Sequence, residues 1–71
     1  MTKFSCTMSS GAVMYYTTLV AENAQQAKEM AVAETNKTSF GAGGEPRDWS
    51  ARALEETEGP ARILTSGQRD A

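Results

Sequence analysis

The scarcity of large apolar side chains limits what this chain can fold into more than any other feature of its sequence. Hydrophobic residues make up 39 % of the 71 positions, and many of them are alanines, which bury little area. A chain of this length buries only roughly 60 % of the surface that it exposes when unfolded. The sequence therefore predicts one domain over residues 1–71, with a thin core and no room for a deep apolar pocket.

Two segments near the N-terminus have the pattern of β-strands. From Lys3 to Met8 apolar and polar residues alternate, which predicts a strand with one buried face. The second segment, Ala12–Ala21, is rich in Tyr, Thr and Val and is partly apolar on both faces. Such a strand is typically central in its sheet or has one face against a partner. Because Gly11 can take the positive φ of a tight turn, we predict a hairpin.

A helix is predicted to follow this hairpin. Asn23 is a favourable N-cap, and Gln26 stands at the spacing of a capping box. Residues 24–35 consist mainly of helix formers, and the alanines on one stripe would let the helix lie close to a sheet. Asn36 can adopt the left-handed conformation that ends a helix, so we expect the helix to end there.

The segment of residues 49–58 fits two structures. Its composition favours a helix that ends at Gly59–Pro60, whereas the strand predicted at Ile63–Thr65 needs a neighbour. A hairpin that pairs Leu54 with Ile63 and Glu55 with Arg62 would provide that neighbour.

Together these elements predict an α+β fold. We expect a small antiparallel sheet in β-β-α-β-β order with one helix packed on one face, and β-β-α-α-β as the alternative. The glycine-rich residues 38–48 are expected to form a flexible loop, and the polar residues 67–71 a frayed tail.

The inventory of residues disfavours catalysis. The chain has no histidine and one cysteine, so an ordinary zinc site cannot be assembled. Cys6 stands at an apolar position with no basic neighbour on its face, which indicates a buried structural thiol. The loop at Phe40–Gly44 lacks the Lys and Ser or Thr of a phosphate-binding loop, and Glu45 follows it. We expect no catalytic residue, no metal and no cofactor.

Aromatic and arginine side chains are the candidates for partner binding, because Tyr, Trp and Arg dominate binding energy at protein interfaces. If the second strand is regular, Tyr16 faces away from Tyr15, and one of the two is left beyond the reach of the small helix. The predicted contact residues are Tyr16, Arg47, Trp49, Arg52 and Arg62. In the alternative interpretation Trp49 fills the core and the arginines are rim residues or ion-pair partners.

Charge and hydropathy restrict the class of partner and the compartment. The net charge of −2 disfavours nucleic acid, which is bound mainly through a basic face. There is no apolar run of a signal peptide at the N-terminus and no stretch long enough to span a membrane. We expect a soluble, cytoplasmic binding protein whose partner is a larger protein assembly or a second copy of the chain.

The organisation of the chain resembles that of the small anti-CRISPR proteins of phages and mobile elements. The resemblance is carried by the hairpin from Lys3 to Val20, by the helix sequence ENAQQAKEMAVAE that begins at Glu22, and by GPARILTSG from Gly59. It implies a non-catalytic inhibitor in the host bacterial cytoplasm that binds a CRISPR effector complex or nuclease stoichiometrically, blocking DNA access or nuclease recruitment. The alternative is a small homodimeric accessory protein or nucleic-acid-binding regulator.

Overall fold

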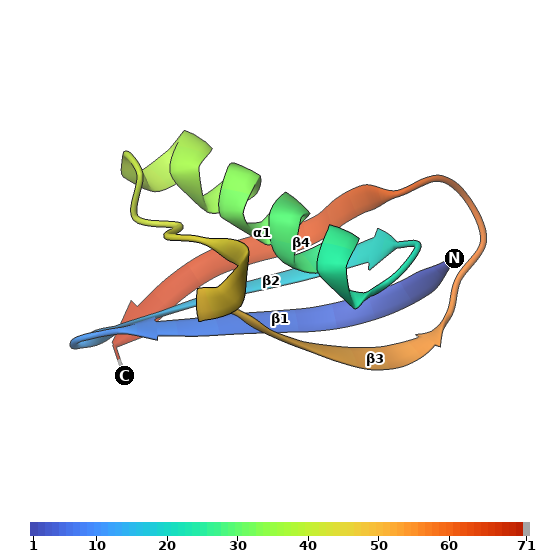
Figure 1. Cartoon of the computed structure of the whole chain (residues 1–71), viewed down its shortest axis with the longest axis horizontal. Coiled ribbons are helices and arrows are strands. Elements are labelled where there is room, and N and C mark those ends of the chain that lie inside the picture. The colour runs from blue at the N-terminus through green and yellow to red at the C-terminus, as the bar shows by residue number, and fades with distance from the viewer. Residues whose placement is uncertain (71) are drawn as a thin grey trace.

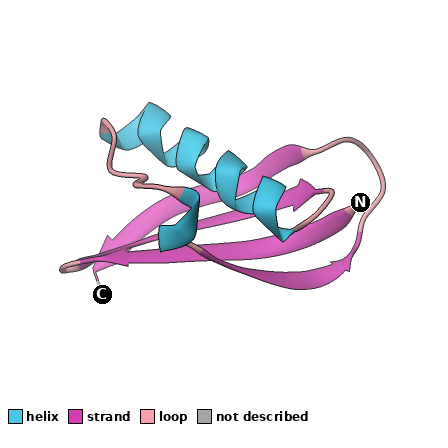
Figure 2. Ribbon diagram, viewed as in Figure 1, coloured by secondary structure: helices cyan, strands magenta, loops and turns pink. Residues whose placement is uncertain are grey.

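The computed structural model describes residues 1–70 and shows one antiparallel sheet with one long helix across it (Figure 1). The elements follow in the order β1 (Thr2–Ser10), β2 (Val13–Ala21), α1 (Ala24–Ser39), the 3-10 helix η1 (Pro46–Asp48), β3 (Ser50–Glu56) and β4 (Arg62–Asp70). The predicted α+β class and the order β-β-α-β-β are confirmed, with a strand rather than a helix after η1. Figure 2 shows that α1 and η1 lie on the same side of the sheet.

The predicted hairpin forms the centre of the sheet. Its turn contains Gly11 at φ 64°, a conformation that strains any residue with a side chain. The register places Phe4 opposite Leu19 and Cys6 opposite Thr17. As expected for a strand that is apolar on both faces, β2 is central, between β1 and β4.

The last two strands lie at opposite edges of the sheet, so the hairpin expected from pairing Leu54 with Ile63 is wrong. The sheet order is β3-β1-β2-β4, in which β3 pairs with β1 and β4 with β2. Their connection crosses the end of the sheet (Figure 1). Arg62 holds it by donating to the carbonyl oxygens of Glu58 and Pro60 at 3.1 and 2.9 Å. With a strand at each edge, the backbone N–H and C=O groups of β1 and β2 find hydrogen-bond partners on both sides. A hairpin of β3 and β4 at one edge would leave the other central strand without a partner on its outer side.

The C-terminal strand extends beyond the predicted Ile63–Thr65. Residues Gly67–Asp70 pair with β2, so they are not the frayed tail that their polarity suggested, and Ala71 lies outside the described residues. The polar sequence is compatible with a strand because most of β4 is solvent-exposed.

Each edge strand contains one extra residue that has no partner in its neighbour. In β3 this residue is Leu54, and in β4 it is Leu64. The two leucines are 42 % and 40 % exposed. A β-bulge of this kind reverses the alternation of side chains along the strand. Residues that strict alternation would place on opposite faces can therefore share one face.

The helix begins where the sequence predicts and ends later. Asn23 Oδ1 accepts a hydrogen bond from the Gln26 backbone N–H at 2.8 Å, which confirms the predicted cap. The expected end at Asn36 is wrong, because Phe40 is the residue in the left-handed conformation. Asn36 lies inside the helix, and its Oδ1 accepts from the Gly43 backbone N–H at 2.8 Å. This bond fixes the following loop to the last turns of α1.

The core lies between α1 and the sheet. It consists of buried side chains from both layers: Phe4, Cys6, Met8, Leu19, Ala21, Ala27, Ala31 and Trp49. The helix contributes only alanines to this set, and their small size lets it pack closely against the strands. Among residues 1–70 no helix has the length and apolarity needed to cross a membrane.

Candidate functional site

One face of the sheet carries no helix, and we call it the open face. The register assigns its members, because paired residues of antiparallel strands point to the same side. They are Lys3, Ser5, Thr7, Ser9, Met14, Tyr16, Thr18, Val20, Ser50, Arg52, Glu55, Arg62, Thr65, Gly67 and Arg69. Hydroxyl side chains run through its middle, and the basic side chains stand towards its ends and edges.

The open face is basic although the chain as a whole has a net charge of −2. It carries Lys3, Arg52, Arg62 and Arg69 against a single carboxylate, Glu55. The acidic excess of the chain therefore lies on the helix side and in the loops.

Two of the four cations are already engaged. Lys3 Nζ lies 3.3 Å from Glu55 Oε1, and Arg62 holds the carbonyl oxygens of the β3–β4 connection. Arg52 and Arg69 are exposed and form no ion pair within residues 1–70. These two arginines are thus the cations that an acidic partner could reach.

Tyr16 forms a small aromatic unit with two residues of β4. A Cβ atom on its register partner Gly67 would lie 2.5 Å from Tyr16 Oη and 2.8 Å from Cζ, so the ring can lie over β4 only because position 67 has no side chain. The guanidinium of Arg69 stands 5.6 Å from the ring centroid, within cation–π range. Tyr16 as a whole is 36 % exposed.

The five predicted contact residues are divided between the two sides of the sheet. Tyr16, Arg52 and Arg62 lie together on the open face. Arg47 is exposed on η1, on the helix side, and pairs with Glu45 at 2.8 Å. Trp49 is 2 % exposed, and its Nε1 donates to the Gly43 carbonyl at 2.7 Å. The prediction that Trp49 contacts a partner is therefore wrong, and the alternative interpretation, a core residue, is correct.

Sequence reasoning missed Arg69 and Lys3 as members of this face. Arg69 stood in the predicted frayed tail, and it shares a face with Arg62 only because the bulge at Leu64 lies between them. Lys3 could have been assigned from the alternation of the first strand, which places it on the side away from Phe4.

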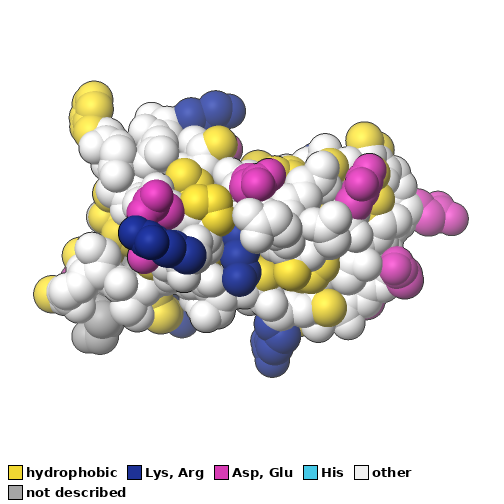
Figure 3. Space-filling model, in the orientation of Figure 1, with side chains coloured by type: hydrophobic (Ala, Val, Ile, Leu, Met, Phe, Trp, Pro, Cys, Tyr) yellow, Lys and Arg dark blue, Asp and Glu magenta, His cyan; other side chains and the backbone are white. Residues whose placement is uncertain are grey.

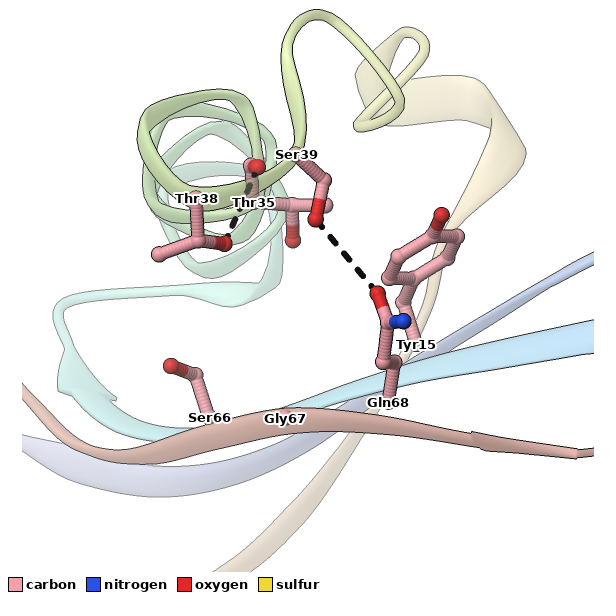
Figure 4. Close-up of a pocket in the computed structure, with 7 residues that line it drawn as sticks. All are labelled: Tyr15, Thr35, Thr38, Ser39, Ser66, Gly67 and Gln68. Atoms are coloured by element: carbon pink, nitrogen blue, oxygen red, sulfur yellow. Dashed lines mark hydrogen bonds between the residues drawn. The ribbon is translucent and has the colours of Figure 1, made fainter.

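A cleft lies on the opposite side of the sheet, between the end of α1 and β4 (Figure 4). Its volume is about 380 Å³, and it is lined by Tyr15, Thr35, Thr38, Ser39, Ser66, Gly67 and Gln68. Ser39 Oγ donates to Gln68 Oε1 at 3.4 Å across it. No acidic or basic side chain lines the cleft.

Reactive groups are scarce in the described part of the chain. Burial raises the pKa of the Cys6 thiol to about 11, although Lys28 opposes the shift, so the thiolate nucleophile is disfavoured at neutral pH. Residues 1–70 contain no cluster of three or more His, Cys, Asp or Glu side chains that could hold a metal ion.

Comparisons with protein families, with curated proteins and with solved structures found no match to this chain. In the view of Figure 3 the apolar patches are small and separated, and the right-hand end shows acidic side chains without basic ones. The open face differs from that end in the sign of its charge.

Proposed function

We propose that this chain is a non-catalytic binding protein that occludes an acidic surface of a larger protein through its open face. The observation that carries the proposal is the concentration of Lys3, Arg52, Arg62 and Arg69 on one face of an otherwise acidic molecule. Complementary charge steers such a face towards an acidic partner and selects against basic ones.

The aromatic unit supplies the second element of an interface. Tyr and Arg are enriched among the residues that contribute most to protein–protein binding, and here Tyr16 and Arg69 are stacked and partly exposed beside each other. Gly67 and the Arg69 stack hold the ring in place before any partner arrives, which reduces the ordering cost of binding.

The resemblance to anti-CRISPR proteins suggests the first partner to test. A CRISPR effector complex binds DNA through basic surfaces, which a basic face would not occupy. The resemblance implies two modes of inhibition, blocking of DNA access and blocking of nuclease recruitment. The positive open face is compatible with the second mode, in which it would cover an acidic docking surface for the nuclease. The expected place of action is the cytoplasm of a bacterial host.

Binding to single-stranded nucleic acid is a second candidate, favoured by the same four basic side chains. Against it, proteins of this kind stack successive bases on several aromatic rings. Tyr16 is the one aromatic residue that the register assigns to the open face, and the Arg69 guanidinium already stands over its ring.

A capture experiment with paired charge reversals tests the proposal. The tagged chain is used to capture proteins from a bacterial lysate that contains CRISPR effector complexes, before and after nuclease treatment. The test variant carries Arg52→Glu and Arg69→Glu. The matched control carries Lys37→Glu and Arg47→Glu, which change the net charge equally at exposed positions on the helix side.

We expect one effector component at fixed stoichiometry that resists nuclease treatment, is lost with the open-face variant and is retained with the control. Loss in both variants would indicate a general charge effect and would contradict the assignment of the face. Capture that disappears after nuclease treatment would favour the nucleic-acid candidate instead.

A further inference from the structure

The cleft between α1 and β4 differs in composition from the rest of the space under the helix. Towards its N-terminus α1 faces the sheet with the buried Ala27 and Ala31, whereas one turn later the buried residue is Thr35. The opposite wall consists of Ser66 and Gln68 of β4 (Figure 4). Polar side chains line both walls, and apart from the hydrogen bond from Ser39 to Gln68 they leave a polar space between the helix and the strand.

Several hydroxyl groups of the cleft have no hydrogen-bond partner within residues 1–70. Thr35 is only 5 % exposed, and while its carbonyl accepts from Thr38 Oγ1 at 3.2 Å, its own hydroxyl makes no bond. The hydroxyls of Tyr15 and Ser66 likewise have none in the described structure. Thr17, the register partner of Ser66, also has a buried Oγ1 without a partner, but it does not line the cleft. Tyr15 is half-buried and Ser66 is exposed, so water can satisfy their hydroxyls, whereas Thr35 is buried in the lining. Buried polar groups are normally satisfied, so the Thr35 hydroxyl indicates that something polar binds beside it.

The chemistry of the lining restricts the ligand. With no charged side chain in the cleft, an anion or a cation entering it would lose hydration without compensation. Hydroxyl groups both donate and accept, and they alternate here with an amide, Gln68, and an aromatic ring, Tyr15. This set matches a compact molecule that carries several hydroxyl groups and an apolar face.

We propose that the cleft binds a neutral polyhydroxylated molecule of the size of a monosaccharide. The volume of about 380 Å³ is at the lower end of the range of about 300–1,000 Å³ found for small-molecule sites. Thr35 and Ser66 hydrogen-bond the ligand from opposite walls, and the ring of Tyr15 contacts its apolar face. The site is independent of the proposed function, because the open face lies on the other side of the sheet.

Titrations followed by two-dimensional amide NMR spectra of the labelled chain test this site. The probes are glucose, galactose, mannose and N-acetylglucosamine, each added separately up to about 50 mM. For so small a ligand in an open cleft we expect a Kd of about 1–10 mM. Saturable shifts are expected at the amides of Thr38, Ser66 and Gln68, and none in β3 at the far edge.

Two isosteric variants separate ligand binding from folding. Thr35→Val removes the buried hydroxyl and is expected to weaken binding about tenfold while the chain stays folded, because no protein hydrogen bond is lost. Thr65 is next to Ser66 in β4 but points to the open face. Thr65→Val therefore removes a hydroxyl outside the cleft and should leave the Kd unchanged. Should Thr35→Val fail to fold, Ser66→Ala provides the same test from the opposite wall.

Absence of saturable shifts with all four sugars would overturn the proposal and leave a cleft that holds water only. The proposal is also overturned if glucose 6-phosphate binds more tightly than glucose, because the uncharged lining disfavours an anion. Equal weakening by Thr35→Val and Thr65→Val would likewise contradict the placement of the ligand in the cleft. The double variant Arg52→Glu, Arg69→Glu should bind the sugar normally, so that failure of this site and failure of the proposed function are distinguishable.

Discussion

Replacing Thr17 by valine should stabilise this protein. Thr17 is 1 % exposed in the middle of β2, and its Oγ1 has no hydrogen-bond partner. A buried hydroxyl without a partner costs about 1–3 kcal/mol, and valine fills the same space with a methyl group while keeping a β-branched side chain that favours strands. We expect the free energy of unfolding to rise by about 1–2 kcal/mol. For a domain of this size that raises Tm by about 5–10 °C.

Urea denaturation followed by far-UV circular dichroism measures this change. The control is Thr18→Val, the next residue on the same strand, which is half-buried on the open face. It should change the free energy of unfolding by no more than about 0.5 kcal/mol. If Thr17→Val destabilises the chain by about 1 kcal/mol or more, the Thr17 hydroxyl has a partner such as a bound water, and the expectation of a gain in stability is wrong.

Three further predictions concern single residues. Phe40→Gly should stabilise the chain by about 0.5–1 kcal/mol in thermal denaturation. Phe40 is 103 % exposed at φ 40°, a conformation that costs a residue with a side chain more than it costs glycine, and unchanged or lower stability would contradict this. Gly67→Ala should displace the Tyr16 ring, since the new Cβ would lie 2.5 Å from its Oη, and should abolish the ring-current shift of the Arg69 side-chain protons in NMR spectra with little loss of stability. Burial raises the pKa of the Cys6 thiol from 9.0 to about 11, so the folded state keeps a proton that the unfolded state releases. The free energy of unfolding should therefore fall as pH rises through this window and not below it, a slope that Cys6→Ala should reduce in urea denaturation.

The sequence predicts the parts of the fold that depend on neighbouring residues. The alternation from Lys3 to Met8, the glycine in the first turn and the Asn23 cap are local signals, and each of them appears in the structure. The end of the helix is set by a contact between residues farther apart: Asn36 binds the backbone of Gly43. The prediction that the helix ends at Asn36 used only the tendency of asparagine to adopt the left-handed conformation, and it could not include the bond to Gly43.

The arrangement of the last two strands depends on long-range pairing. Ile63 and Leu54 could be read as partners because the segment between them resembles a turn. In the structure the central hairpin has two free edges, and each edge takes one strand. The connection can cross the sheet because Arg62 binds its carbonyl oxygens and because the Thr57 N–H donates to the Met1 carbonyl at 2.8 Å. The contact between Thr57 and Met1 joins residues far apart in the sequence, so it is not visible in a local pattern.

The charge of the open face differs from the net charge of the chain because of the two bulges. The bulge at Leu64 places Arg62 on the same face as Arg69, and the bulge at Leu54 places Glu55 beside Lys3, where it neutralises that cation. A chain-wide charge of −2 thus coexists with a basic face, and which residues form that face is decided by two one-residue shifts in register. Binding through the open face should therefore weaken as salt concentration rises, as expected for a basic protein, even though the chain is acidic.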